Sequence, residues 1–201
     1  MTLLQADDDR RPLPRTVDCG GAPVELRLMG PEDRDEVLAF AGALAPHDLL
    51  FLRRDITQPR VIDAWLRSIR SGAITSVLAR LEGEVVGCLA LVRDPLSWSP
   101  HLAELRVLLS DRARGRGLGV LLAQEGLVLG LRSGAEKLYA QMTVDQQAAI
   151  AIFEGLGFAP EALLRDHVKD REGRTHDVVL LGHHVARMAS RLQAYGVDEA
   201  G

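Results

Sequence analysis

The sequence has few of the features that mark secreted, membrane or nucleic-acid-binding proteins. It holds only two cysteines, Cys19 and Cys88, too few for a disulfide framework and in keeping with a reducing compartment. Its formal net charge is -4, whereas a nucleic-acid binder uses cationic residues to neutralise phosphates. No apolar run approaches the ~18 residues that span a bilayer, and acidic Asp7 to Asp9 stand where a signal peptide carries positive charge. We therefore expect a cytoplasmic protein that binds neither nucleic acid nor membrane.

Length and composition indicate one globular domain with irregular ends. The 201 residues are 47% hydrophobic and 26% charged, which are ordinary values for a domain with a sizeable core. Residues 1–23 mix charges with three prolines and lack periodicity, so we predict a flexible N-terminal lead. The folded domain is expected over residues 24–182, with a C-terminal helix and tail over residues 183–201. A homodimer could use the lead or the tail helix as its contact.

Hydrophobic periodicity predicts strands and helices in mixed order. The predicted strands cover residues 24–29, 73–81, 84–92, 102–109, 137–144, 163–169 and 176–181. The predicted helices lie between residues 31 and 46 and over residues 58–71, 118–132, 146–154 and 183–194. Glu82 and Gly83 indicate a β-hairpin turn, and the strand, helix and strand over residues 102–144 indicate a parallel pair with a right-handed crossover.

A basic, glycine-spaced turn joins the strand at residues 102–109 to the following helix. It holds three glycines and three arginines: Gly115, Gly117, Gly119, Arg112, Arg114 and Arg116. The first four N–H groups of a helix lack partners inside it, and the helix dipole places roughly half a positive charge there. Glycines let a phosphate approach the backbone, and arginine donates to phosphate in pairs. The turn is therefore predicted to bind a phosphate-bearing ligand.

The spacing of these glycines separates several phosphate-binding motifs. It reads G-x-G-x-G, so it meets neither the dinucleotide pattern G-x-G-x-x-G nor the P-loop pattern with its Gly-Lys-Ser/Thr. A nucleotide-binding Rossmann-like protein is one alternative, and it requires an acid at the end of the strand after the helix. Asp145 is the only residue that offers this acid, and it comes late in the chain. The glycine turn by itself therefore leaves the ligand open.

Two motifs in a fixed order narrow the choice. The first is Arg114-x-x-Gly117-x-Gly119 after a strand ending Val-Leu-Leu, and the second is the segment from Gln146 to Phe158. They resemble the R/Q-x-x-G-x-G/A acyl-CoA pyrophosphate loop and the N-x-x-A-I-x-L-Y-E-x-L-G-F helix of the GNAT acetyltransferases. The resemblance extends over residues 24–181.

The resemblance implies both a fold class and an activity. The fold would be a mixed α/β fold with a twisted, mostly antiparallel sheet, a central splayed parallel pair and flanking helices. The activity would be transfer of an acetyl group from acetyl-CoA to a primary amine of a small molecule or peptide, by direct attack in a ternary complex and without a metal. A non-catalytic acyl-CoA-binding or regulatory module is the alternative.

The resemblance also implies which residues bind acetyl-CoA. The end of the strand would pair its main chain with the pantetheine arm, and the turn would hold the pyrophosphate. Two residues of the second motif, one in place of asparagine and one in place of tyrosine, would lie beside the arm. The implied residues are Val107, Leu108 and Leu109, then Arg112, Arg114, Gly115, Arg116, Gly117, Leu118 and Gly119, and then Gln146 and Phe153.

The catalytic residues are less clear from the sequence. Glu104 is the only acid on the strand and is our candidate for the base that takes the ammonium proton. The alternative is that Glu104 only contacts Arg106 on the same face of the strand. His101, His47 and Asp145 are lesser candidates for the base. Phe153 cannot donate a proton, so the departing thiolate would leave unaided, be protonated by water or use another group such as Tyr139.

Overall fold

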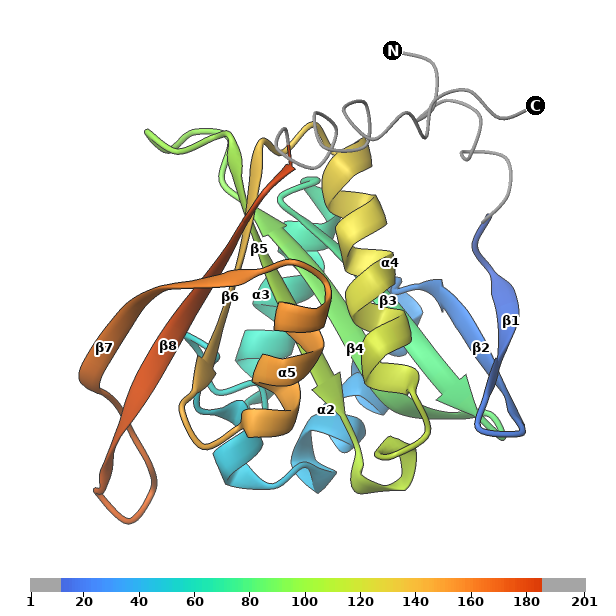
Figure 1. Cartoon of the computed structure of the whole chain (residues 1–201). Helices are drawn as coiled ribbons and strands as arrows, with labels where there is room; N and C mark the ends of the chain where they lie inside the picture. Colours follow the sequence, from blue (N-terminus) through green and yellow to red (C-terminus); the bar gives the residue numbers. More distant parts are fainter. Residues whose placement is uncertain (1–11, 186–201) are drawn as a thin grey trace.

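The computed structural model describes residues 12–185 (Figure 1). Its strands are β1 Arg15–Cys19, β2 Ala22–Leu28, β3 Ile74–Leu81, β4 Glu84–Arg93, β5 Leu102–Leu109, β6 Lys137–Thr143, β7 Ala159–Lys169 and β8 Thr175–His184. Its helices are α2 Arg34–Ala43, α3 Pro59–Arg70, α4 Leu118–Arg132 and α5 Gln147–Gly155, with short 3-10 helices η1 Pro31–Asp33, η2 Pro46–Leu49 and η3 Asp111–Ala113. Each element predicted within residues 24–182 has a counterpart here. No helix in this range is long and apolar enough to cross a membrane.

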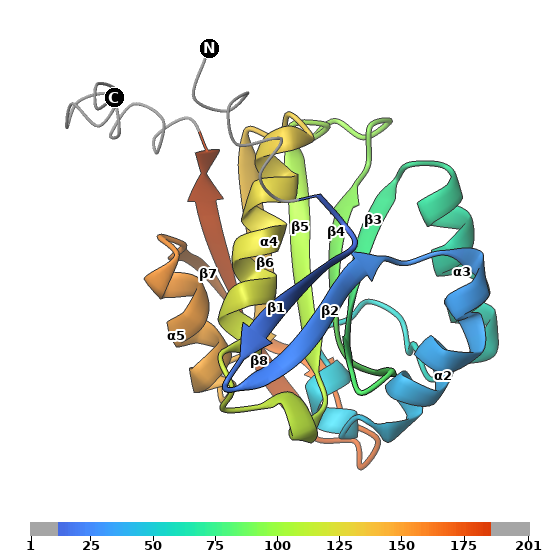
Figure 2. The ribbon, with the colours of Figure 1, turned by 90° about the vertical axis from the view of Figure 1, so that its right-hand side faces the viewer.

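The strands form one mixed sheet in the order β1-β2-β3-β4-β5-β6-β8-β7. Neighbouring strands are antiparallel except for β5 and β6, which are parallel and joined through α4. Figure 2 shows α4 and α5 on one face of the sheet and α2 and α3 on the other. The predicted fold class, a mostly antiparallel sheet with one central parallel pair, is confirmed.

Each face of the sheet has its own hydrophobic core. The first core joins the sheet to α4 and α5 through residues such as Leu105, Leu122 and Phe153. The second joins the sheet to α2 and α3 through residues such as Val37 and Ile62. Because both faces are covered, the central strands read as nearly continuous apolar runs rather than as alternating patterns.

Local sequence signals set the ends of the elements. α3 begins with Pro59, whose fixed φ suits the first helical turn, and the chain leaves the helix through Gly72 at a φ of 77°. The turn between β3 and β4 places Glu82 at a φ of 53° and Gly83 at 84°, the pair of positive values that a tight hairpin requires.

The parallel pair separates shortly after it begins. Backbone pairing between β5 and β6 covers only three rungs, which end at Glu104 opposite Tyr139. On its other edge β5 stays paired with β4 from Ala103 to Leu109. One edge of β5 is therefore left without a strand partner beyond Glu104.

The predicted N-terminal lead needs correction. Residues 15–19 of this segment form β1, which pairs with β2 along its whole length. Arg15 also bonds through both terminal nitrogens to the carboxylate of Glu125 in α4, whose side chain is 1% exposed. This contact could not be predicted from the sequence, because its two partners lie 110 positions apart. Residues 1–11 lie outside the described range.

The tail prediction is also partly wrong. His183 and His184, the first residues of the helix predicted over residues 183–194, belong to β8. Residues 186–201 lie outside the part of the chain that the structure describes.

Glycines let α4 approach the sheet closely. A Cβ added at Gly126 would lie 2.2 Å from a methyl carbon of Leu105 and 2.8 Å from one of Leu89, and both leucines are fully buried. A Cβ at Gly130 would lie 2.6 Å from Leu138. The helix therefore rests on the sheet with no room for side chains at these positions.

We predict that Gly126→Ala lowers the free energy of unfolding by about 1–2 kcal/mol, because overpacking of the core outweighs the better helix propensity of alanine. Gly42→Ala is the matched control, since Gly42 is an exposed helical glycine whose added Cβ would meet nothing within 4 Å. Chemical denaturation measures both. A Gly126→Ala protein as stable as the parent would contradict the close packing of α4.

Candidate active site

The glycine turn forms an open cradle of backbone amides at the start of α4. Gly115 and Gly117 have φ values of 70° and 82°, and an added Cβ at either would meet nothing within 4 Å. The Leu121 N–H donates to the carbonyl of Gly117 at 3.1 Å, so the amides of the first turn precede the first intrahelical bond. A Cβ added at Gly119, by contrast, would lie 3.1 Å from Leu109 and 3.2 Å from Ile152, so the part of the turn open to an anion is at Gly115 and Gly117.

The three arginines of this turn point in different directions. Arg114 pairs with Asp48 of η2 at 2.5 Å and with Asp111 at 3.1 Å. Arg112 pairs with Glu82 and Glu84 on the β3–β4 turn. Arg116 packs beside Gly20 in the turn between β1 and β2. Sequence spacing alone could not separate these orientations.

A groove of about 730 Å³ runs from this turn along the gap between β5 and β6, and we call it the β5–β6 groove. The residues of the predicted cofactor set that line it are Val107, Leu108, Leu109, Arg114, Gly115, Gly117, Gly119, Gln146 and Phe153. The remaining members, Arg112, Arg116 and Leu118, do not line it. The structure therefore brings most of the set to one groove.

The backbone of β5 offers free polar groups to this groove. The carbonyl of His101 accepts the N–H of Lys137 on the β6 side, whereas the N–H of Ser110 donates to Val86 of β4. Backbone groups alternate between the two edges of a strand. Leu105, Val107 and Leu109 therefore share the orientation of His101, and their N–H and C=O groups face the gap. Leu108, by the same alternation, directs its backbone to β4 and contributes only its side chain to the groove.

Glu104 lies at the last paired rung, where the two strands part. Its carboxylate accepts two hydrogen bonds from Arg106, at 2.9 and 2.7 Å, and one from the Tyr139 hydroxyl at 3.3 Å. Side chains alternate along a strand, so Glu104, Arg106 and Leu108 face the α3 side while Leu105 packs under α4. The Glu104–Arg106 contact proposed from the sequence is present. Glu104 also lines a hollow on the α3 side of β5, described below.

Tyr139 and Phe153 occupy opposite sides of the sheet. Burial, reinforced by the Glu104 charge, raises the pKa of Tyr139, so its hydroxyl stays protonated and able to donate. Phe153 is 5% exposed and stacks edge-on against Phe158 with ring centres 5.1 Å apart. It therefore presents an apolar wall to the β5–β6 groove.

Two residues named separately from the sequence, His47 and Asp145, meet across the mouth of this groove. His47 Nε2 lies 2.7 Å from Asp145 Oδ2. Burial acts to raise the pKa of Asp145, but hydrogen bonds from Thr143 and His47 lower it below its usual value. The His47 ring also meets the ring of His176 at 5.2 Å. Since Asp145 lies six positions past Tyr139, about 20 Å along an extended chain, this pair is remote from the Glu104 rung.

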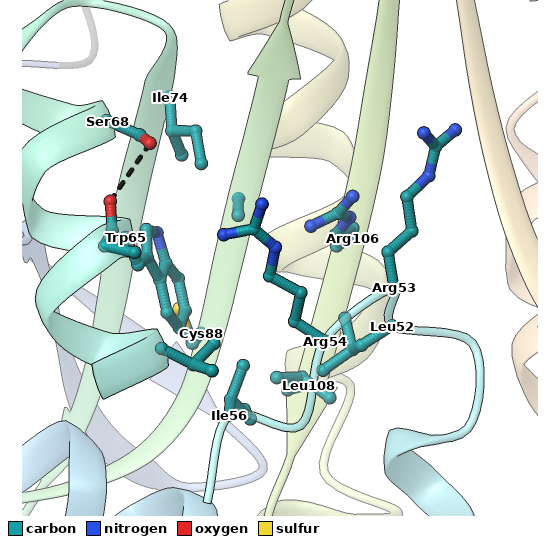
Figure 3. A pocket seen from close by; sticks show the side chains of 13 residues that line it. Leu52, Arg53, Arg54, Ile56, Trp65, Ser68, Ile74, Cys88, Arg106 and Leu108 are labelled. Carbon is teal, nitrogen blue, oxygen red and sulfur yellow. Dashed lines mark hydrogen bonds between the residues drawn. The ribbon is translucent and has the colours of Figure 1, made fainter. Parts of the chain in front are cut away.

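The α3 side of β5 contains two adjoining hollows, an inner cavity of about 210 Å³ and an outer groove of about 850 Å³. The two hollows share Arg53, Arg54 and Arg106 (Figure 3). Glu104 and Tyr139 line the outer groove, and Leu108 lines both the inner cavity and the β5–β6 groove. Arg53 and Arg54 could not be predicted as site residues from the sequence, because a pair of arginines in a loop carries no motif.

Comparison with known proteins identifies the family. The profile of the Acetyltransferase (GNAT) family matches residues 44–158, which is more than half of the chain. The chain belongs to this family. No curated protein sequence matches it significantly. The resemblance drawn from the two GNAT motifs is therefore confirmed.

Solved GNAT structures share the fold of the chain. A GNAT acetyltransferase from Streptococcus pneumoniae is 24% identical with a TM-score of 0.70, covering 81% of this chain and 99% of that one. A ribosomal-protein-alanine N-acetyltransferase from Brucella melitensis is 22% identical with a TM-score of 0.70, covering 80% and 99%. A GNAT phosphinothricin acetyltransferase from Sinorhizobium meliloti, in complex with acetyl-CoA, is 20% identical with a TM-score of 0.70, covering 80% and 88%.

The shape and polar groups of the β5–β6 groove suit an acyl-CoA. The amide cradle and Arg114 suit a pyrophosphate, and the free edge of β5 suits the amides of a pantetheine arm. Asp48 holds Arg114 at the rim, so a phosphate would exchange one anionic partner of this guanidinium for another.

We predict that Arg114→Gln weakens acetyl-CoA binding about tenfold, because one charge-assisted phosphate contact is lost. Arg112→Gln makes the same change of charge in the same turn, but its side chain pairs away from the groove, so affinity is expected to stay within twofold. Isothermal titration calorimetry measures both. An equal loss of acetyl-CoA affinity in the two variants would show that binding depends only on the net charge of the turn.

Proposed function

We propose that the protein transfers an acetyl group from acetyl-CoA to a primary amine by direct attack in a ternary complex. One observation carries the proposal: the β5–β6 groove and the inner cavity on the α3 side approach each other at β5, where Leu108 lines both. Acetyl-CoA in one hollow and an amine in the other would meet there. Such positioning supplies most of the rate in a reaction of this kind.

The cysteines favour direct attack over a covalent acetyl-enzyme. Cys88 lines the inner cavity, but burial raises the pKa of its thiol to about 12. Burial, followed by the Asp18 charge, also raises the pKa of Cys19. A thiol attacks as its thiolate, and these two thiols stay protonated at neutral pH. The amine itself is therefore the nucleophile that the site supports.

Glu104 and Tyr139 are the proposed proton-transfer groups. Acetyl-CoA supplies an activated thioester: the nitrogen–carbon bond forms, the carbon–sulfur bond breaks, and the thiolate takes a proton. Glu104 Oε1 accepts one bond and Oε2 accepts two, so Oε1 keeps an acceptor position for a proton of the amine. The protonated hydroxyl of Tyr139, which donates to this carboxylate at 3.3 Å, is the proposed proton donor in the role that Phe153 cannot fill.

Initial rates of CoA release test the order of events. With acetyl-CoA and an accepted amine both varied, double-reciprocal plots are expected to intersect, as a ternary complex requires. Parallel lines would indicate an acetyl-enzyme and would contradict direct attack. Binding of acetyl-CoA without CoA release across polyamines, aminoglycosides, amino acids and peptide N-termini would instead favour the non-catalytic module.

We predict that Glu104→Gln lowers kcat about a hundredfold or more, the usual contribution of a general base. The affinity for acetyl-CoA is expected to stay unchanged, because Glu104 does not line the β5–β6 groove. Glu136→Gln is the control, since Glu136 is exposed and precedes β6. A Glu104→Gln enzyme with parental kcat would leave Glu104 only as the partner of Arg106.

A further inference from the structure

Cationic side chains dominate the hollows on the α3 side of β5. Arg53, Arg54 and Arg106 are the charged residues of the inner cavity, and no acidic residue lines it. The outer groove adds Arg93 and Lys137 and three acids, Asp94, Glu104 and Glu161. This local positive charge contrasts with the formal net charge of -4 of the whole chain.

The acids near these arginines are largely committed to other partners. Glu104 bonds to Arg106, and Glu161 pairs with Lys137 at 2.6 Å. Asp55 follows Arg54 directly, but its carboxylate accepts hydrogen bonds from the backbone and hydroxyl of Thr57 at 3.0 and 2.6 Å. Within residues 12–185, neither Arg53 nor Arg54 forms an ion pair.

The other polar side chains of the inner cavity, Ser68 and Trp65, already donate hydrogen bonds to protein groups. Ser68 donates its hydroxyl proton to the carbonyl of Ala64 at 3.1 Å (Figure 3). The ring N–H of Trp65 donates to Ser76 at 2.9 Å, so this side chain offers its apolar ring to the cavity. The guanidinium groups are therefore the polar features left to recognise a ligand, and apolar side chains form the other walls.

Three like charges around one small cavity repel one another, and the repulsion grows as water leaves. Arg106 is only partly neutralised, because Nε and Nη2 bond to Glu104 while Nη1 makes no bond to a residue in the described range. Figure 3 shows Arg54 reaching from its loop toward Trp65 and Ser68, whereas Arg53 extends to the other side, and Arg106 lies between the two in this view. A planar carboxylate relieves this repulsion and matches the paired donors of a guanidinium.

We infer that the acceptor is an amine that also bears a carboxylate, namely a free amino acid with an apolar side chain. The carboxylate binds between Arg54 and Arg106, with Arg53 at the rim, and the side chain enters the inner cavity. The amine then faces Glu104 at the rung where β5 and β6 part. A cavity of about 210 Å³ equals roughly seven water volumes, enough for an aliphatic or aromatic side chain. This inference rests on the proposed acetyl transfer and names its substrate class.

The same charges argue against polycationic acceptors. A polyamine would place additional ammonium groups beside Arg53 and Arg54. Among the described acids of these hollows, only Asp94 lacks a cationic partner, and it lines the outer groove but not the inner cavity. The net charge of -4 of the whole chain therefore does not predict the charge of the acceptor at this site.

Steady-state CoA release with paired amines tests the inference. L-leucine, L-methionine and L-phenylalanine are compared with their carboxamides, which keep the amine and side chain but lose the anion, and with spermidine. At least one amino acid is expected to exceed its carboxamide and spermidine at least tenfold in kcat/KM. Arg54→Gln is expected to raise KM for that amino acid at least tenfold, with kcat within threefold and the rate with the carboxamide within twofold.

Arg70→Gln is the matched control, because Arg70 is exposed at the end of α3 and lines none of these hollows. It is expected to leave all rates within twofold. Equal losses for amino acid and carboxamide in Arg54→Gln would show a structural role and overturn the inference. CoA release with spermidine or the carboxamides at least as fast as with the amino acids would overturn it while leaving acetyl transfer intact. Absence of CoA release with every amine, despite acetyl-CoA binding by calorimetry, would overturn both proposals.

Discussion

The separation of β5 from β6 is the constraint on which the rest of the site depends. Backbone N–H and C=O groups are strong hydrogen-bonding groups, and leaving them unpaired inside a protein costs free energy. The two strands nonetheless pair over only three rungs, although β4 pairs with β5 from Ala103 to Leu109. α4 rests closely on β5 at Gly126, and the other edge of β6 is paired with β8 from Lys137 to Thr143. A ligand with amide groups can complete the ladder where a strand is missing.

The parts that could be predicted from the sequence are those encoded by neighbouring residues. Periodicity located each strand and helix within residues 24–182, and the Glu82–Gly83 turn located a hairpin by its backbone needs alone. The glycine turn was readable because a helix start and its glycines are adjacent in the chain. Family resemblance then supplied the splayed pair, which no local pattern encodes.

The parts that could not be predicted depend on residues far apart in the chain. β1 was missed because its pairing with β2 and the contact of Arg15 with Glu125 are both set by the folded structure. The three arginines of the turn looked equivalent, yet only Arg114 faces the groove. Arg53 and Arg54 gained meaning only when the fold placed them beside Arg106 from β5, with the nearby acids already engaged. The face of β5 on which Glu104 lies likewise could not be predicted without the register of the sheet.

The short stretch from Pro46 to Arg54 contacts both sides of the molecule. Asp48 reaches the guanidinium at the start of α4, His47 reaches the end of β6, and the arginines a few positions later line the cavity behind β5. In the proposed reaction the two substrates would share this piece of backbone as a common wall. A change that displaces this backbone would then alter both Michaelis constants together, whereas replacing a single side chain on it can change one of them alone.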